Sequence, residues 1–423
     1  MLLQKQIIHF YICINVASNE MIMKKSLLKA LFVLAVSSAF ISCEKDKEVD
    51  PAEEVGEFKF IRILVNDEVT KQISLVDPVK LSVESFEAQF AKSALYGTQA
   101  GRFGALVTTA SNNVQLFDTG FEGHGDHVDV KGTPKFGALT SSSNKPTHFK
   151  SKVDEIITFN DGDGTLSIAK EADFHVSGAK MTTIATGNVA HHGAMTKFDN
   201  GTYAITEKNP SIAGSLPERV RIIDGTGKTL FASTVETKGI HGNASDGKVS
   251  LFGSSSGVLV VESTGAQRLI AHPVNFGTAW FSSIYEAKGA NKFIGYSAAV
   301  GAYIIDVTSN KVTPVIESAD LIQVKMDYAG NNLIAFLHSG EVKIYDLATN
   351  ALKKSGSIVS AVAKDETQKP QLEATTKYLY VTQPKTGELL KIDIKDLSKV
   401  DKIKVSPTPY RLSILGIESN ESH

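Results

Sequence analysis

Short runs of β-branched and aromatic residues, separated by turns, dominate the chain from Phe58 onward. Gly, Asn, Asp or Thr residues bound each run, as expected for the strands of β-hairpins. The second run of a pair usually closes on an aspartate. These aspartates are Asp77, Asp118, Asp224, Asp306, Asp346 and Asp393. Long amphipathic helical patterns are absent, so the sequence predicts an all-β body over residues 58–423.

Copies of this pattern recur at intervals of roughly 40–50 residues, the period of four-stranded propeller blades. The expected inner strands start near Gly97, Pro146, Ala190, Ile240, Thr278, Ile322, Gln371 and Tyr410. A single β-propeller follows, with eight blades favoured. Seven blades are the alternative, because the terminal copies are the least regular. Pairing of the C-terminal run 410–417 with residues 58–77 would close the ring and remove an exposed sheet edge.

Composition narrows the classes of function. The 423 residues carry a formal net charge of -2, and 42% of them are hydrophobic. The chain therefore has material for a large core but no broad charged field for nucleic acid, so no nucleic-acid partner is expected. Only two cysteines occur, which excludes a disulfide framework as the source of stability.

Residues 21–42 have the features of a secretion signal, with two lysines followed by an apolar run and small residues. The apolar run, 27–41, is too short for an ordinary membrane span. It ends in Phe40-Ile41-Ser42-Cys43, which resembles the lipobox of bacterial lipoproteins. That resemblance implies cleavage before Cys43 and lipidation of its sulfur. A plain signal peptide with a chance cysteine is the alternative.

Two further segments, residues 1–20 and 43–57, flank the predicted signal. Residues 1–20 precede the basic start of the signal and are interpreted as an upstream extension from a misassigned start codon. Residues 43–57 are rich in Glu, Asp and Lys, bury little, and are expected to form a flexible tether. The expected location is the envelope of a Gram-negative bacterium, lipid-anchored in the periplasm or on the outer-membrane surface.

Candidate chemistry lies in four histidine segments with small neighbours. The first is Gly123–His127, and three later ones each place a histidine near the start of an expected inner strand. Because inner strands line a propeller channel, we expect these side chains to converge on one cation at the channel mouth. The predicted ligands are His124, His127, His148, His192, His241 and Asp126. Imidazole and carboxylate suit zinc.

Two further residues accompany this set. Asp129 and His191 are alternative ligands or acceptors that fix an imidazole tautomer, and His191 is expected to point away from His192 because adjacent strand residues face opposite sides. Buried histidines that hydrogen-bond the channel wall are the alternative to a metal site. His175, His272 and His338 are expected to be surface or half-buried histidines.

Several segments resemble the AztD-type zinc metallochaperones, which are β-propeller proteins of the bacterial periplasm. The matching segments are Asp118-Thr119-Gly120, His124-Gly125-Asp126-His127, Lys145-Pro146-Thr147-His148-Phe149, His191-His192-Gly193 and His241-Gly242. The resemblance implies Zn²⁺ as cargo and handover to the solute-binding protein of a zinc ABC importer. The chain differs from that family in two respects: residues 44–58 contain no histidine, and Cys43 is a predicted lipid anchor.

The sequence therefore predicts a monomeric, non-enzymatic zinc carrier. A metal-dependent hydrolase is one alternative, for which Asp126 or Asp129 would be the general base. Asp161-Gly162-Asp163-Gly164 is similar to a calcium loop but lacks the closing glutamate, so it is interpreted as a hairpin turn. A metal-independent propeller that binds protein or glycan at the cell surface is the other alternative.

Overall fold

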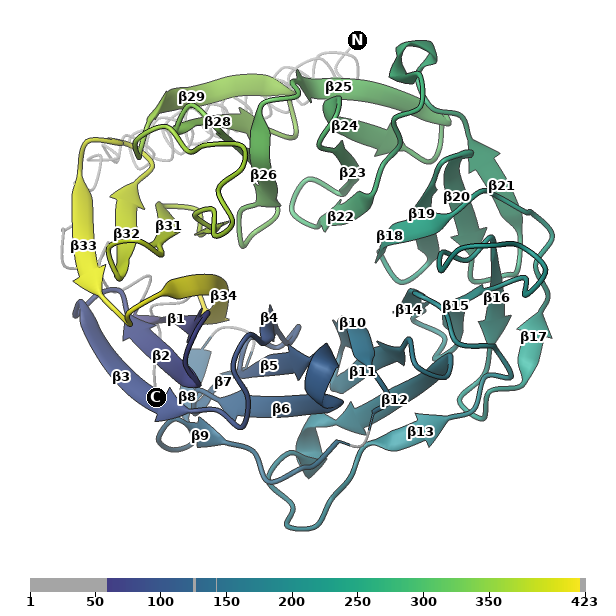
Figure 1. Cartoon of the computed structure of the whole chain (residues 1–423), viewed down its shortest axis with the longest axis horizontal. Coiled ribbons are helices and arrows are strands. Elements are labelled where there is room, and N and C mark those ends of the chain that lie inside the picture. Colours follow the sequence, from purple (N-terminus) through teal and green to yellow (C-terminus); the bar gives the residue numbers. More distant parts are fainter. Residues whose placement is uncertain (1–58, 125–126, 142, 419–423) are drawn as a thin grey trace, which may run out of the picture. The chain divides into compact units, whose positions relative to one another are not determined.

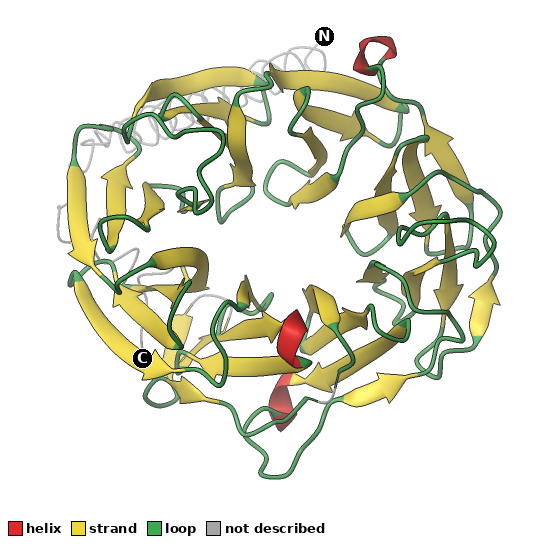
Figure 2. Cartoon of the chain, in the orientation of Figure 1, coloured by secondary structure: helices red, strands yellow, loops and turns green. Residues whose placement is uncertain are grey.

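Eight four-stranded antiparallel sheets surround a central channel in the computed structural model (Figures 1 and 2). The structure describes residues 59–124, 127–141 and 143–418. The predicted signal, tether and lipidation site at Cys43, as well as Asp126, lie outside the described residues. No helix in the described ranges has the length and apolar character to span a membrane. The predicted all-β propeller with eight blades is confirmed.

The blades are numbered along the chain. The first contains β4 (Ala94–Gly97), β5 (Phe103–Thr108), β6 (Asn113–Asp118) and β9 (Lys135–Phe136), with the inserted hairpin β7 (Phe121–His124) and β8 (His127–Val130). The second contains β10 (Pro146–Lys152), β11 (Glu155–Asn160), β12 (Thr165–Lys170) and β13 (Thr182–Ile184). The third contains β14 (Met195–Lys197), β15 (Tyr203–Glu207), β16 (Arg219–Ile223) and β17 (Thr229–Phe231). The fourth contains β18 (Ile240–Ser245), β19 (Val249–Ser254), β20 (Gly257–Glu262) and β21 (Gln267–Ile270).

The second half of the ring repeats this order. The fifth blade contains β22 (Ser283–Ala287), β23 (Lys292–Ser297), β24 (Gly301–Asp306) and β25 (Lys311–Glu317). The sixth contains β26 (Leu321–Met326), β27 (Asn332–Leu337), β28 (Glu341–Asp346) and β29 (Ala351–Ser357). The seventh contains β30 (Leu372–Ala374), β31 (Tyr378–Gln383), β32 (Glu388–Asp393) and β33 (Val400–Lys404). The eighth contains β34 (Pro409–Ile417), β1 (Phe60–Asp67), β2 (Gln72–Asp77) and β3 (Ser82–Glu87). Three short 3₁₀ helices lie in the described connections: η1 (Thr109–Ser111), η2 (Glu171–Asp173) and η3 (Val274–Phe276).

The eighth blade closes the ring. Its inner strand β34 comes from the C-terminus and pairs with β1 from Phe60↔Ile417 to Asp67↔Pro409. The purple and yellow ends of the chain therefore share one sheet (Figure 1). This pairing confirms the predicted closure, and it satisfies backbone groups that would otherwise form an exposed edge.

The recurring aspartates stand where third strands end. Asp306 illustrates their role, since its Oδ1 accepts hydrogen bonds from the backbone N–H groups of Thr308 at 2.8 Å and Ser309 at 3.1 Å. A short carboxylate that bonds the backbone two or three residues ahead favours a turn. The repeated aspartate therefore starts the turn into the outermost strand.

Eight buried clusters seal the joints between neighbouring blades in the described part of the chain. The joint between the second and third blades, for example, buries Phe159 against Met195 and Tyr203. β-branched and aromatic side chains fit these pleated, two-sided surfaces. The core is therefore distributed around the ring, and the channel is left for polar side chains.

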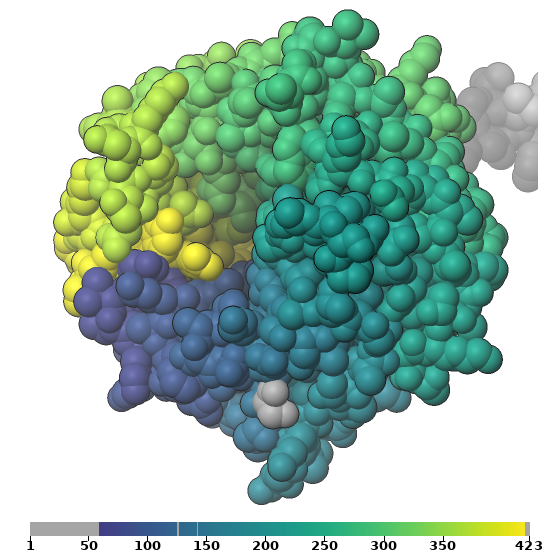
Figure 3. Space-filling model, turned by 45° about the vertical axis from the view of Figure 1, so that its right-hand side comes forward, coloured from purple at the N-terminus to yellow at the C-terminus, as the bar shows by residue number. Residues whose placement is uncertain are grey.

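The ring has two rims, which we name by the inner strands. The amino rim is where inner strands begin, and it also carries the turns between second and third strands. The carboxyl rim is where inner strands end, and it carries the connections between third and outermost strands. The space-filling view shows the surface hollowed at the centre of the ring (Figure 3).

Candidate metal centre

Three histidines from consecutive blades meet at the amino rim. His148 lies near the start of β10, His192 lies in the loop before β14, and His241 is the second residue of β18. One ring nitrogen from each lies within 4.8 Å of the others. The Nε2 atoms of His148 and His192 are 3.4 Å apart. The structure thus brings together the three predicted residues that begin inner strands.

Hydrogen bonds orient two of the three rings. The Nδ1 of His192 lies 2.6 Å from Asp161 Oδ2, and the Nδ1 of His241 lies 2.8 Å from the carbonyl oxygen of Ser282. Because an oxygen acceptor takes the proton on Nδ1, the Nε2 of each ring is left unprotonated. Metal-binding histidines are commonly held this way. The Nε2 of His192 lies within hydrogen-bond distance of the Nε2 of His148, and a cation would replace this contact.

Glycines allow these close approaches. A Cβ on Gly242 would lie 2.5 Å from the Cα of Ser283 and 2.6 Å from the carbonyl oxygen of Ser282. A Cβ on Gly193 would lie 2.2 Å from the ring of Phe159. The glycines that follow His192 and His241 therefore let the chain pass close enough to its neighbour to place these two imidazoles.

The His148 ring is strongly desolvated. Burial and the neighbouring His192 and His241 lower its pKa from 6.5 to about 3. The ring is therefore neutral at physiological pH, which is the protonation state that a metal ligand requires.

His191 does not join the group. Its side chain is buried, with Nδ1 2.8 Å from the carbonyl oxygen of Val189 and Nε2 3.1 Å from Thr206 Oγ1. Burial lowers its pKa. With both nitrogens engaged by the protein, His191 anchors the loop that carries His192 and presents no lone pair to the other three rings.

His124 belongs to a second group, on the β7–β8 hairpin. Ligand atoms from Glu122, His124 and Asp129 lie within 4.8 Å of one another, and the rings of His124 and His127 stack with centroids 5.5 Å apart. The Lys131 ammonium lies 2.8 Å from Asp129 Oδ2 and 3.5 Å from Glu122 Oε2. This ion pair lowers the pKa of Asp129.

The two groups lie on opposite rims. The hairpin follows β6, whose last residue pairs with Phe103 at the carboxyl rim. A Cβ on Gly123 would meet Ile417, the last residue of inner strand β34. The expected convergence of all four histidine segments is therefore corrected. An insertion between the third and outermost strands emerges on the rim opposite to the start of the next inner strand.

Asp161 and Ser282 contact this site, but the sequence analysis does not assign them to it. The sequence predicts a hairpin turn at Asp161, which does lie in the turn after β11, but its carboxylate bonds His192. The turn between second and third strands shares the amino rim with the start of the next inner strand. From this rule of blade topology, Asp161 could have been predicted to lie near His192.

The channel below the three histidines is polar. A cavity of about 370 Å³ is lined by residues that include Lys150, Lys152, Lys197, Lys325, Glu286 and Glu373. Burial lowers the pKa of Lys150 to about 8. Ion pairs join Lys152 to Asp199 at 2.8 Å and Lys197 to Glu155 at 3.1 Å.

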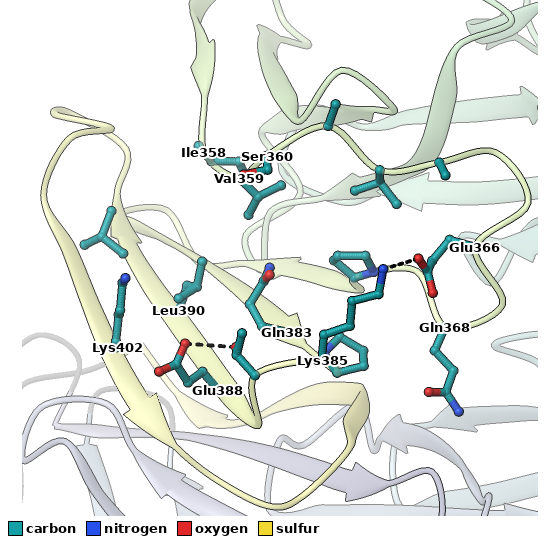
Figure 4. Close-up of a pocket in the computed structure, with 17 residues that line it drawn as sticks. Ile358, Val359, Ser360, Glu366, Gln368, Gln383, Lys385, Glu388, Leu390 and Lys402 are labelled. Atoms are coloured by element: carbon teal, nitrogen blue, oxygen red, sulfur yellow. Dashed lines mark hydrogen bonds and ion pairs between the residues drawn. The ribbon is translucent and has the colours of Figure 1, made fainter.

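A separate cavity of about 540 Å³ lies beside the sixth and seventh blades (Figure 4). Ile358 and Leu390 contribute apolar walls, and Gln383 projects between them. Two of its charged residues, Lys385 and Glu366, form an ion pair with each other. Its lining contains no histidine or cysteine, so it lacks the donors of a zinc site.

Of the other described histidines, His175 is exposed and His272 and His338 are half-buried, and all three have protein partners. His175 lies 2.7 Å from Asp118 Oδ2, His272 contacts the carbonyl oxygen of Ser254, and His338 contacts that of Val362. These contacts agree with the structural role expected for them.

Comparison with known proteins relates the chain to zinc carriers. The zinc chaperone AztD of Citrobacter koseri is 24% identical over 327 residues, which cover 74% of each protein. The crystal structure of that AztD superimposes with a TM-score of 0.76 at 20% identity, covering 84% of this chain and 98% of the other. Its apo structure gives the same TM-score at 19% identity, with the same coverage of both chains.

A more distant likeness concerns the fold alone. The dihydro-heme d1 dehydrogenase NirN superimposes with a TM-score of 0.56 at 13% identity, covering 83% of this chain and 74% of the other. No protein-family model matches the chain. The sequence relative and the AztD structures together confirm the resemblance to the AztD-type zinc chaperones that the histidine-containing segments indicate.

Proposed function

We propose that this protein is a zinc chaperone that holds Zn²⁺ between His148, His192 and His241 at the amino rim. The observation that carries the proposal is the convergence of three ring nitrogens within 4.8 Å, with two of the rings oriented by oxygen acceptors. Zinc binds imidazole nitrogen at about 2.0–2.1 Å and favours four-coordinate sites.

Three neutral imidazoles suit a carrier because they leave the fourth position to a ligand from outside. A partner can supply a donor at that position and then replace the histidines one at a time. No thiolate competes among the described residues, since both cysteines, Cys13 and Cys43, lie outside them. The site is therefore expected to release zinc more readily than a Cys₄ site would.

The acceptor in this proposal is the solute-binding protein of a zinc ABC importer in the same envelope compartment. Similarity to a zinc chaperone supports cargo transfer as the class of function. A lipid anchor at Cys43 would tether the carrier to a membrane, so acceptor and carrier would meet at the envelope surface rather than by free diffusion.

The hairpin residues form a second, weaker cation site in this proposal. Glu122, His124, His127 and Asp129 supply oxygen and nitrogen donors, but the Lys131 ammonium already pairs with both carboxylates, and Arg102 also pairs with Glu122. A cation would have to displace this ammonium from an exposed surface. Zinc binding at the hairpin is therefore expected to be weaker than at the amino rim.

The hydrolase alternative lacks a described general base at the three histidines. Asp129, its candidate, belongs to the hairpin at the carboxyl rim, and Asp161 is already bonded to His192. A metal-independent scaffold would give no reason for ring nitrogens from three blades to converge within 4.8 Å, so the zinc carrier accounts for more of the structure.

Zinc titration of the purified protein, followed by calorimetry with a competing chelator, tests the proposal. We expect one tight site in the wild type, and its loss in His148→Ala and His241→Ala. His338→Ala is the matched control, because His338 is also half-buried and hydrogen-bonded to a carbonyl oxygen. Tight binding that survives both rim substitutions would refute the assignment.

A further inference from the structure

Lys150 forms a second layer of the channel, directly below the histidines. Side chains two residues apart on a strand share a face, so Lys150 follows His148 along the channel side of β10. Its Nζ donates a hydrogen bond of 2.9 Å to the carbonyl oxygen of Asn243 on β18. Asn243 is two residues beyond His241, so this contact spans the same two blades as the His148–His241 pair.

The charge of Lys150 is not neutralised as the other channel lysines are. Lys152 pairs with Asp199, Lys197 with Glu155 and Lys325 with Glu373. Within the described ranges, Lys150 has no carboxylate at ion-pair distance.

A carboxylate lies on the other side of the site. Asp161 belongs to the turn at the amino rim and bonds His192 from there. The three histidines therefore lie between a carboxylate toward the rim and an ammonium toward the channel. A cation bound to them is attracted toward the rim and repelled from the channel.

We propose that Lys150 determines how tightly the cation is bound and from which side it enters and leaves. This proposal rests on the proposed zinc site. The Lys150 ammonium weakens binding from the channel side, so that zinc enters and leaves only across the amino rim. A divalent cation is repelled by this ammonium twice as strongly as a single positive charge would be, and burial limits the screening of that repulsion by salt.

Substitution of Lys150 tests this proposal. In Lys150→Met we expect zinc affinity to rise about ten-fold and release to a chelator to slow correspondingly. Lys150→Arg keeps the charge and should bind zinc as the wild type does. Lys152→Met is the matched control, because Lys152 lies on the same strand face but is paired with Asp199, and we expect less than about a two-fold change there.

Unchanged or weaker zinc binding in Lys150→Met would overturn the proposal. Unchanged affinity would mean that the ammonium does not influence zinc binding, and weaker affinity would mean that Lys150 stabilises the site. An equal gain in Lys152→Met would overturn it as well, because the effect would then belong to the net charge of the channel. Thermal melting of the metal-free variants verifies that they fold. Failure of the wild type to bind zinc would refute the proposed function instead.

Discussion

The two histidine groups contain similar donors but differ in how the fold holds them. At the amino rim, the three rings are half-buried, come from three blades, and present free nitrogens to one another. At the carboxyl rim, the His124 and Glu122 side chains are 45% and 37% exposed, come from one hairpin, and lie beside Lys131. The difference teaches that donor type alone does not define a metal site. Burial and orienting partners separate the two, as does Lys131, whose ammonium already contacts the carboxylate donors of the hairpin.

Removal of a ligand should give the largest difference in zinc affinity between the two histidine groups. In His192→Ala we expect zinc affinity to fall more than about 100-fold, beyond the 10–100-fold cost of losing a partner of a ligand. His124→Ala should leave the tight site unchanged. Competitive titration with a fluorescent chelator measures both. Equal losses of zinc affinity in the two variants would contradict the assignment of the tight site to the amino rim.

Removing an orienting partner should have the next largest effect. Asp161→Asn keeps the size of the side chain but removes its negative charge beside His192, so we expect zinc affinity to fall about 10–100-fold. The same titration checks this, with Asp163→Asn as control, because the Asp163 carboxylate bonds Thr165 within the turn. An unchanged affinity would mean that the His192 ring is held by packing alone.

The desolvated ring should also make stability depend on pH. Because burial lowers the pKa of His148 to about 3, the unfolded chain, with an ordinary value near 6.5, binds more protons between these limits. The free energy of unfolding contributed by this residue is thus present above pH 6.5 and lost as the pH falls toward 3, by at most ~1.4 kcal/mol per pH unit.

Urea denaturation of the metal-free protein at pH 7, 6 and 5 measures that slope. His148→Gln should reduce it, whereas His124→Gln, at the exposed hairpin, should leave it as in the wild type. If both variants keep the wild-type slope, other groups account for the acid sensitivity and His148 is better solvated than the structure indicates.

The smallest expected effect concerns the hairpin itself. Lys131→Met removes the ammonium that pairs with Glu122 and Asp129, so cation binding at the carboxyl rim should strengthen about two- to five-fold, as for other exposed charge pairs. Calorimetry in a background that lacks His192 isolates this site. A decrease would show that Lys131 organises the hairpin instead of competing with the cation.

The site was partly predictable because its three histidines begin successive inner strands. The blade period places residues such as His148 and His241 at equivalent positions, and equivalent positions line one rim. Asp161 and Ser282 escaped prediction because their contacts cross from one blade to the next. The hairpin was misplaced because strand periodicity does not say on which rim an insertion emerges.

The sequence by itself determined the all-β class, the eight repeats, the turn-starting aspartates and the closure of the ring, because alternation and turn chemistry are local properties. Only the tertiary structure decided which histidines share a cation site, which one is sequestered by Thr206, and where Lys150 lies relative to them. Those outcomes depend on distances between blades, which are set by the packing of side chains far apart in the chain.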